Sequence, residues 1–232
     1  MVFVIAEIGV NWDGEIELAE EMIHKAKQIG CSAVKFQSFT DKMVEQHPEK
    51  IRLLRSSINK KNIEEVYQIS KKYDIEWMCT PMYPEAVDLI DPYLKRFKIR
   101  EHDSRTIFEG KKNQIFDNII RTGKEVLISS KKNPKNSKIF HYSQCRFLYC
   151  IPKYPCYINE IDFRNLNDFD GYSNHCTNLL APLMAAIKGV KIIEIHMTSN
   201  KFKKFIDNNV SFDYTEFEKL MELINNLKLL KF

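Results

Sequence analysis

Residues 171–196 read GYSNHCTNLLAPLMAAIKGVKIIEIH, which is a short extended stretch, a helix-forming stretch and an apolar run in immediate succession. Residues 169–173 and 190–196 have the length and composition of strands, whereas residues 181–189 are rich in alanine and other helix formers. Two parallel strands need a crossover of this kind, because the chain must return to the end of the sheet where the first strand began before the second strand can run in the same direction. The segment therefore predicts a βαβ unit.

The same alternation of strand and helix continues along the rest of the 232-residue chain. Apolar runs predict further strands at residues 2–9, 32–39, 75–81, 94–100, 125–130 and 144–151. Helical periodicity predicts helices at residues 15–30, 62–74, 84–93, 106–123 and 213–230. Eight strands in βα units, with no interior linker, indicate a single domain over residues 1–232 that is either an open parallel sheet or a closed barrel. No GxGxxG motif follows the first strand, so we favour an α/β (βα)₈ TIM barrel.

Two of the crossovers are too weak to form full helices. Residues 131–143 are polar and are interrupted by Pro134, and residues 156–168 allow only a turn or two of helix. We therefore predict shortened or missing helices around strands five and six. The barrel wall left uncovered there would be apolar, and large exposed apolar patches usually mark interaction sites. A homo-oligomer or a complex with a partner subunit is the expected consequence.

Composition narrows the class of protein. The chain has 35 basic and 31 acidic residues, and the formal net charge of +4 gives no reason to expect binding to nucleic acid or to a membrane. Six cysteines lack CxxC spacing, and the N-terminus has neither the basic start nor the long apolar run of a signal peptide. No stretch approaches the ~18 apolar residues of a membrane span. We expect a soluble cytoplasmic protein with reduced thiols.

Polar residues gather at the ends of the predicted strands, where a barrel places its chemistry because the βα loops converge there. Charged residues inside apolar strands are costly to bury unless they are paired or bind a ligand, so Glu7, Lys35 and Lys98 are candidate functional residues. His175 and His196 end strands seven and eight. Neighbouring strands lie ~4.8 Å apart, so both imidazoles can reach one cation such as Mn²⁺, Zn²⁺ or Fe²⁺. Hydrogen-bonding pocket residues are the alternative interpretation of this pair.

Several motifs carry a resemblance to a known family. In chain order they are IAEIGVNWDG, AVKFQSF, CTP, KIREHD, GYSNHCTNLLAPLMAAIKGVKIIEIHMT and FIDNNVSFDYTEFEKL. In order and spacing they resemble the barrel domain of the N-acetylneuraminate (sialic acid) synthase family, from about residue 3 to about residue 228. The resemblance implies a (βα)₈ enzyme that condenses phosphoenolpyruvate with the open-chain aldehyde of an N-acyl amino sugar. The implied products are a nonulosonic, sialic-acid-like acid and phosphate, which is released by C–O cleavage.

The same resemblance implies roles for individual residues. A divalent metal, Mn²⁺ or Mg²⁺, is expected on His175 and His196 as a Lewis acid for the aldehyde. The expected catalytic residues are Asp103, which would handle protons, together with Glu7 and Lys98. The expected substrate-binding residues are Lys35, Gln37, Lys98, Arg100, Ser129, Tyr154, Ser173 and Asp207. Two lysines on separate strands suit phosphoenolpyruvate, because it is a multiply charged anion whose phosphate leaves during the reaction.

The chain departs from the family pattern at the phosphate-binding turn. A KIGSGD-like sequence reads KIREHD here, so Arg100, Glu101 and His102 stand where two glycines and a serine are expected. Those glycines let backbone N–H groups approach an anion, whereas Glu101 would repel phosphate unless Arg100 compensates. Family members usually carry a C-terminal antifreeze-like domain that helps to bind the sugar, and this chain is expected to lack it. Sugar recognition would then differ or come from another polypeptide.

Two other functions also fit the residues. Departures near the site are typical of a non-catalytic or diverged barrel that retains the fold and binds the metal or a ligand. A further hypothesis is an aldolase or lyase acting on another phosphorylated acid, in which Lys98 or Lys35 forms a Schiff base.

Overall fold

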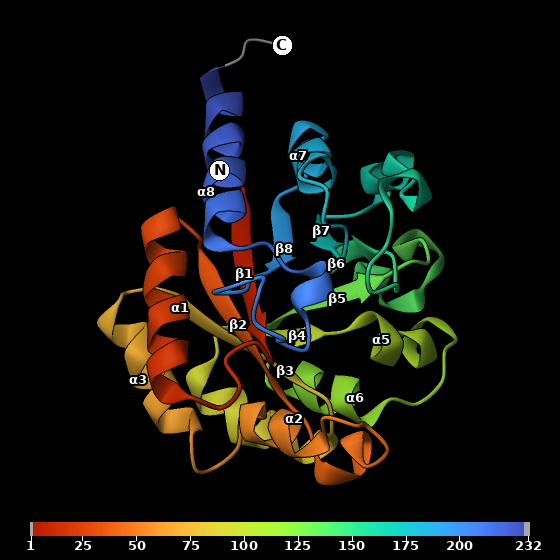
Figure 1. Cartoon of the computed structure of the whole chain (residues 1–232). Helices are drawn as coiled ribbons and strands as arrows, with labels where there is room; N and C mark the ends of the chain where they lie inside the picture. The colour runs from red at the N-terminus through yellow and green to blue at the C-terminus, as the bar shows by residue number, and fades with distance from the viewer. Residues whose placement is uncertain (1, 230–232) are drawn as a thin grey trace.

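The structure, a computed structural model, describes residues 2–229 and contains eight parallel strands that alternate with helices (Figure 1). The strands are β1 (Phe3–Gly9), β2 (Ala33–Ser38), β3 (Glu76–Pro81), β4 (Arg96–Ile99), β5 (Glu125–Ser130), β6 (Cys145–Cys150), β7 (Gly171–Asn174) and β8 (Ile192–His196). The α-helices are α1 (Ile16–Ile29), α2 (Lys50–Ser56), α3 (Ile63–Lys72), α4 (Pro84–Ile90), α5 (Glu101–Phe108), α6 (Gln114–Arg121), α7 (Leu180–Ile187) and α8 (Tyr214–Asn226). This order confirms the (βα)₈ TIM barrel predicted from the sequence.

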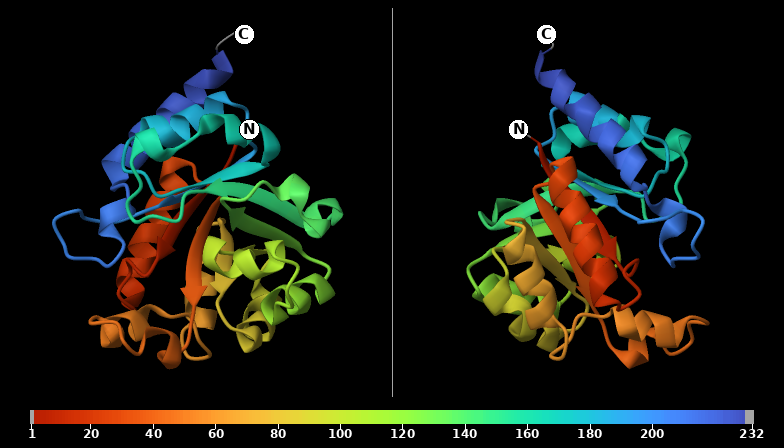
Figure 2. Two further views of the ribbon diagram at one scale, coloured as in Figure 1. Left: turned by 90° about the vertical axis from the view of Figure 1, so that its right-hand side faces the viewer. Right: turned by 60° about the vertical axis from the view of Figure 1, so that its left-hand side comes forward.

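The strands form one sheet in the order β3-β2-β1-β8-β7-β6-β5-β4, which curls until β3 and β4 lie side by side (Figures 1 and 2). Within the described residues no ladder hydrogen bonds join β3 to β4, so the barrel is nearly closed rather than fully closed. Side chains bridge this seam instead. Arg96 on β4 donates from Nε to Glu76 on β3 at 2.7 Å and from Nη1 to Glu125 on β5 at 2.6 Å. One guanidinium therefore ties together the N-terminal ends of three strands.

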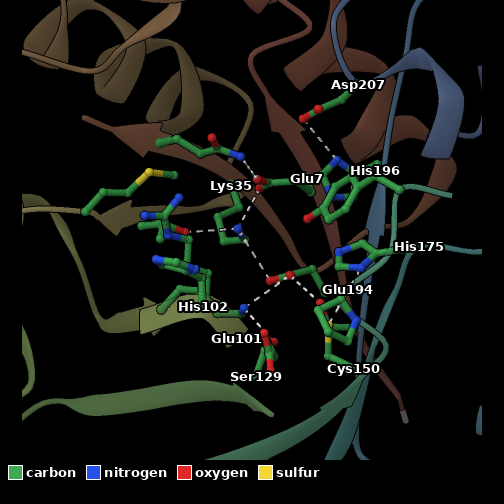
Figure 3. Close-up of a pocket in the computed structure, with 18 of the residues that line it drawn as sticks. Glu7, Lys35, Glu101, His102, Ser129, Cys150, His175, Glu194, His196 and Asp207 are labelled. Atoms are coloured by element: carbon green, nitrogen blue, oxygen red, sulfur yellow. Dashed lines mark hydrogen bonds and ion pairs between the residues drawn. The ribbon is translucent and has the colours of Figure 1, made fainter. Parts of the chain in front are cut away.

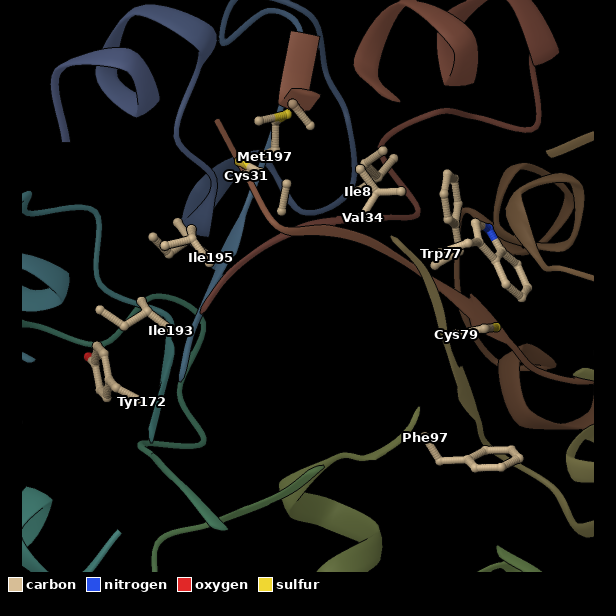
Figure 4. Close-up of a cluster of buried hydrophobic side chains, with 14 of the residues drawn as sticks. Ile8, Cys31, Val34, Trp77, Cys79, Phe97, Tyr172, Ile193, Ile195 and Met197 are labelled. Carbon is tan, nitrogen blue, oxygen red and sulfur yellow. The ribbon is translucent and has the colours of Figure 1, made fainter. Parts of the chain in front are cut away.

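Alternate residues on each strand face the barrel interior, because successive side chains in a strand point to opposite faces. Near the N-terminal ends the inward residues are apolar and form a plug, composed of Ile5, Ala33, Met78, Leu127, Leu148 and Ile192. Outward residues such as Val34 and Phe97 belong to a larger core between the strands and the helices (Figure 4). Two residues beyond the plug the inward face becomes polar, and it includes Lys35 and Glu194. The apolar plug thus supports a polar floor.

The ring of helices around the barrel is incomplete where the sequence predicts it to be. Only short 3₁₀ turns connect β5 to β6 and β6 to β7. They are η3 (Pro134–Asn136), η4 (Lys138–His141), η5 (Ile158–Glu160) and η6 (Phe163–Asp168). The prediction of shortened or missing helices around strands five and six is therefore confirmed. Among residues 2–229, none of the helices combines the length and the apolar character that crossing a bilayer demands.

The predicted helix at residues 106–123 is two helices in the structure. The first, α5, begins at Glu101 and ends before Gly110, whose φ of +69° is a left-handed conformation that favours glycine. The side chain of Asn113 then caps the N-terminus of α6. The seven residues of α2 are absent from the prediction, because so short a segment carries little periodicity. The last predicted helix corresponds to α8, and residue 230 of its predicted range lies outside the described residues.

Candidate active site

A cavity of about 370 Å³ opens at the C-terminal ends of the strands (Figure 3). Eleven of the twelve site residues predicted from the sequence line it, namely Glu7, Lys35, Gln37, Lys98, Arg100, Ser129, Tyr154, Ser173, His175, His196 and Asp207. The twelfth, Asp103, is not part of the lining. Residues that are distant in the chain thus meet in one pocket, whose volume is typical of a small-molecule site.

Two buried lysines and one buried glutamate form the centre of the cavity. Nζ of Lys35 lies 3.6 Å from Oε2 of Glu194, and Nζ of Lys98 lies 3.4 Å from its Oε1. Lys98 also donates to Oγ of Ser129 at 2.7 Å, and Ser173 donates to Glu194 at 2.9 Å. Each of these five side chains belongs to a residue that is no more than 3% exposed. Because water is largely excluded, the charges interact more strongly than they would on the surface.

The three charges shift one another's pKa values. Burial opposes the charge on Glu194, but Lys35 and Lys98 outweigh burial and lower the pKa of Glu194 to about 2. Burial also opposes the charge on Lys35, but Glu194 and Glu7 outweigh it and raise the pKa of Lys35. For Lys98 burial prevails and lowers the pKa, because Glu194 offsets only part of the desolvation. Lys98 is therefore the cation that gains most from an added anion.

Glu7 lies beside Lys35 on the neighbouring strand. Oε2 of Glu7 is 2.8 Å from Nζ of Lys35, and Oε1 accepts a hydrogen bond from Gln37 at 2.7 Å. Burial nevertheless raises the pKa of Glu7, because Lys35 offsets only part of the desolvation. At Gly9, where β1 is bulged and φ is +55°, an added Cβ would come within 3.1 Å of both Glu7 and Gln37. Glycine thus leaves room for the Glu7 carboxyl group and its hydrogen bond to Gln37.

The imidazoles of His175 and His196 share one side of the cavity, with ring centroids 5.5 Å apart (Figure 3). Nδ1 of His175 hydrogen-bonds the carbonyl of Ile151 at 2.8 Å, and Nδ1 of His196 lies 3.5 Å from Oδ2 of Asp207. Neither Nε2 atom hydrogen-bonds to any of residues 2–229. Burial lowers the pKa of His175 to about 3. Burial also opposes the charge on His196, but Asp207 outweighs it and raises the pKa of His196.

The two imidazoles fit a divalent metal ion. Metal-binding histidines usually direct one ring nitrogen to a carbonyl or carboxylate and ligate through the other. Nδ1 of His175 is held in this way by the carbonyl of Ile151, and Nδ1 of His196 lies near Asp207 without a hydrogen bond to it. In the part of the chain that the structure describes, no three His, Cys, Asp or Glu side chains form a complete metal cluster. The remaining ligands would therefore be water or substrate oxygens, as in catalytic metal sites with open positions.

The first turn of α5 forms the wall of the cavity beside Lys98, and Asp103 lies on this turn. Asp103 accepts a hydrogen bond from Nε of Arg100 at 2.5 Å, and its carboxylate does not reach the cavity lining. A proton-transfer residue must come within hydrogen-bond reach of the substrate. The structure places Asp103 outside the cavity lining, and its catalytic role stays a prediction.

Glu194 is a functional candidate to which the sequence interpretation assigns no role. The sequence contains a signal for it, because Glu194 lies two residues before His196 and must share its face of the strand. Its contacts with two lysines, however, depend on how the barrel curls. Thr80 is a second such residue, since its Oγ1 accepts a hydrogen bond from Nζ of Lys35 at 3.1 Å.

Comparisons with known proteins agree with the fold. The sequence model of the NeuB family matches residues 22–231. An N,N'-diacetyllegionaminic acid synthase of Legionella pneumophila is 27% identical, with 97% of this chain and 71% of that protein covered. A pseudaminic acid synthase of Campylobacter jejuni is also 27% identical, with 96% and 73% covered. A crystal structure of N-acetylneuraminic acid synthetase from Leptospira borgpetersenii matches with a TM-score of 0.86 at 22% identity, covering 98% of this chain and 84% of that one.

The fold is that of the TIM barrel found in sialic acid synthases. The chain belongs to the NeuB family, which confirms the resemblance carried by its sequence motifs. Its relatives include synthases of legionaminic and pseudaminic acids.

Proposed function

We propose that this protein condenses phosphoenolpyruvate and one water molecule with the open-chain aldehyde of an N-acyl amino sugar. The water adds to C2 of phosphoenolpyruvate as the C–O bond to phosphate breaks, so the products are a nonulosonic acid and inorganic phosphate. The observation that carries the proposal is the convergence of buried Lys35 and Lys98 on a cavity that also holds the free Nε2 atoms of His175 and His196. An anion and a carbonyl compound can therefore bind side by side. The synthase names of the relatives support the same class of reaction.

Lys98 and Ser129 hold the phosphoenolpyruvate anion in this proposal, and Ser173 fixes Glu194 beside them. The charge of Lys98 is incompletely offset by Glu194, so an anionic ligand supplies the missing counter-charge. The Ser129 hydroxyl accepts a hydrogen bond from Lys98, so its own O–H can donate to the anion, whereas the Ser173 hydroxyl donates to Glu194 and holds that carboxylate in place. Such preorganised groups also stabilise the charge that accumulates on phosphate as the C–O bond breaks. Lys35, held between two carboxylates, adds a second fixed positive charge.

His175 and His196 hold the divalent metal, Mn²⁺ or Mg²⁺. When bound, the metal supplies Lewis acidity to the aldehyde oxygen. His175 is neutral at pH 7, as its pKa of about 3 requires, and a neutral imidazole is the form that ligates. Asp207 lies 3.5 Å from Nδ1 of His196 and orients that ring.

Glu7 is the proposed proton-transfer residue, because burial raises its pKa and because it lines the cavity. Gln37 fixes its carboxylate through a 2.7 Å hydrogen bond. Tyr154, whose ring centroid lies 4.0 Å from that of His175, and Asp207 offer an aromatic face and a carboxylate to the amino sugar. The names of the relatives specify different acids, so the class of acceptor is proposed here and not one particular sugar. A partner subunit and a cytoplasmic location stay predictions of the sequence.

Lys98 also supports a second candidate function. A buried amine with a lowered pKa is what a Schiff-base aldolase or lyase requires. Borohydride reduction in the presence of pyruvate separates the two candidates. The synthase predicts no covalent adduct, whereas a stable mass increase on Lys98 would favour the lyase.

Phosphate release from phosphoenolpyruvate tests the proposed function. We expect release that requires both a divalent metal and an N-acyl amino sugar, and that stops when EDTA removes the metal. Lys98→Ala should lower the rate by about 100-fold, because a preorganised charge is lost. Lys188→Ala, at an exposed position after α7, serves as the control and should behave as the unmodified protein. No turnover across a panel of amino sugars with Mn²⁺ supplied would favour a non-catalytic barrel instead.

A further inference from the structure

Helix α5 and the residue before it carry two arginines that are each held along one edge by a carboxylate. Arg105 donates from Nε and Nη2 to Glu101, at distances of 2.7 to 3.2 Å. Arg100 donates from Nε and Nη2 to Asp103, at 2.5 and 3.3 Å. Neither Nη1 atom hydrogen-bonds to any residue in the described range 2–229. Each guanidinium is therefore fixed along one edge and free along the other.

Both arginines border the cavity next to the candidate phosphate site. Arg100, Glu101 and Arg105 line the same cavity as Lys98 and Ser129. The hydroxyl of Ser104 donates to the carbonyl of Ser129 at 2.8 Å, which anchors α5 to the end of β5. The side chains of Arg100 and Arg105 are 35% and 49% exposed, so a ligand entering from solvent can reach them.

The charges of this wall balance until an anion arrives, because two carboxylates face two guanidinium groups. Glu101 alone would repel a phosphate group, but its pairing with Arg105 removes most of that repulsion. A guanidinium carries five N–H donors in a planar fork, so it can hold a carboxylate along one edge and a phosphate along the other. The KIREHD sequence thus places side-chain donors where a glycine-rich turn would offer backbone N–H groups.

We propose that Arg105 and Arg100 bind the phosphate group of phosphoenolpyruvate through their free Nη1 edges. Glu101 and Asp103 are positioning residues that hold the opposite edges. This inference rests on the proposed function and adds Arg105 as a specificity-determining residue. It also gives Asp103 a role that matches its position outside the cavity lining.

Calorimetric titration of the full chain with phosphoenolpyruvate, and separately with inorganic phosphate, tests the proposal. Arg105→Gln should weaken both ligands by about 10-fold, because charge-assisted hydrogen bonds to phosphate are lost. Arg105→Lys keeps the positive charge but loses the planar fork of N–H donors. Its affinity for both ligands should therefore lie between that of the unmodified protein and that of Arg105→Gln. Arg164→Gln is the matched control, because Arg164 pairs with Asp162 in the same way on the exposed surface. The affinity of the Arg164→Gln variant for both ligands should equal that of the unmodified protein.

Glu101→Gln separates positioning from simple charge repulsion. If Glu101 positions Arg105, the substitution weakens phosphoenolpyruvate binding by about 3- to 10-fold, although it removes a negative charge from the cavity. Tighter binding by Glu101→Gln would overturn the positioning role. Binding by Arg105→Gln within about twofold of the unmodified protein, while Lys98→Ala loses binding, would overturn the inference and leave the proposed function standing. If the unmodified protein with Mn²⁺ fails to bind phosphoenolpyruvate, the proposed function itself fails.

Discussion

Glu7 and Lys35 are register partners on β1 and β2, and Oε2 and Nζ of these two residues lie 2.8 Å apart in the cavity. Both residues are almost fully buried, with 1% and 3% of their surface exposed. Glu194 brings a second carboxylate to 3.6 Å from the same ammonium group. Lys35 therefore pairs with two carboxylates at once, one of which, Glu194, it shares with Lys98, and the electrostatics of the site depend on this lysine.

Removing Lys35 should destabilise the fold. We expect Lys35→Met to lower the free energy of unfolding by about 3 kcal/mol at neutral pH, because Glu7 and Glu194 lose their shared cation while staying buried. Urea unfolding measures the loss. Lys72→Met is the control, because the side chains of Lys72 and its partner Glu20 are 62% and 36% exposed, and this change should leave the free energy of unfolding nearly unaltered. Equal losses in the two variants would contradict the prediction.

The charge of Lys98 should set an alkaline limit on phosphoenolpyruvate binding. Burial lowers the pKa of Lys98 below 10.5. Because the anion binds the protonated amine, raising the pH removes the charge before pH 10.5 is reached, and the Kd should increase as it does so. Arginine stays protonated in this range, so Lys98→Arg should show no alkaline loss. Calorimetric titration at a series of pH values measures the Kd of the unmodified protein and of Lys98→Arg. Identical pH dependence in the two proteins would refute the role of Lys98 as the cation that binds phosphoenolpyruvate.

Substitution of either histidine should weaken Mn²⁺ binding. We expect His175→Ala and His196→Ala each to raise the Kd for Mn²⁺ by at least about 100-fold, and Asp207→Asn to raise it by about 10-fold through the orientation of His196. The electron paramagnetic resonance signal of free Mn²⁺ reports the bound fraction. His141→Ala, at an exposed position on η4, should leave the Kd unchanged. Unaltered Mn²⁺ binding in both histidine variants would rule out the proposed metal site.

The β3–β4 seam makes Arg96 important for stability. We expect Arg96→Met to lower the free energy of unfolding by about 2 kcal/mol, because two charge-assisted hydrogen bonds are lost, one across the seam to Glu76 and one to Glu125 on β5. Arg146→Met is the comparison, since Arg146 is 40% exposed and lies 3.5 Å from Glu125. That change should cost less than about 1 kcal/mol. A similar loss from both variants would mean that the seam does not depend on Arg96.

The sequence predicts the barrel and most of the cavity because strand side chains alternate strictly between two faces. Once Ile5 and Ala33 are assigned to the interior, Glu7 and Lys35 must follow on the same face, whatever the surrounding loops do. The βα order then brings the ends of the strands together. These local rules are sufficient to place His196 at the cavity without any knowledge of its neighbours.

The remaining features depend on relationships that no local rule contains. Asp103 is kept from the cavity because α5 begins at Glu101, upstream of the predicted helix, and this start decides which residues of the turn face inward. Glu194 contacts both Lys35 and Lys98 only because the sheet curls far enough to bring β2 and β4 to the same carboxylate. Hydrogen bonds to Asp103 and Glu101 likewise decide which edge of each guanidinium group stays free. Sequence periodicity does not predict these short-range contacts.

The bond that breaks in phosphoenolpyruvate tests the proposed condensation most directly. Phosphoenolpyruvate labelled with ¹⁸O at the oxygen between carbon and phosphorus is turned over with Mn²⁺ and an accepted amino sugar, and both products are analysed by mass spectrometry. Condensation with C–O cleavage predicts that the label leaves with inorganic phosphate. Label retained in the carbon product would mean P–O cleavage and would contradict the proposed reaction.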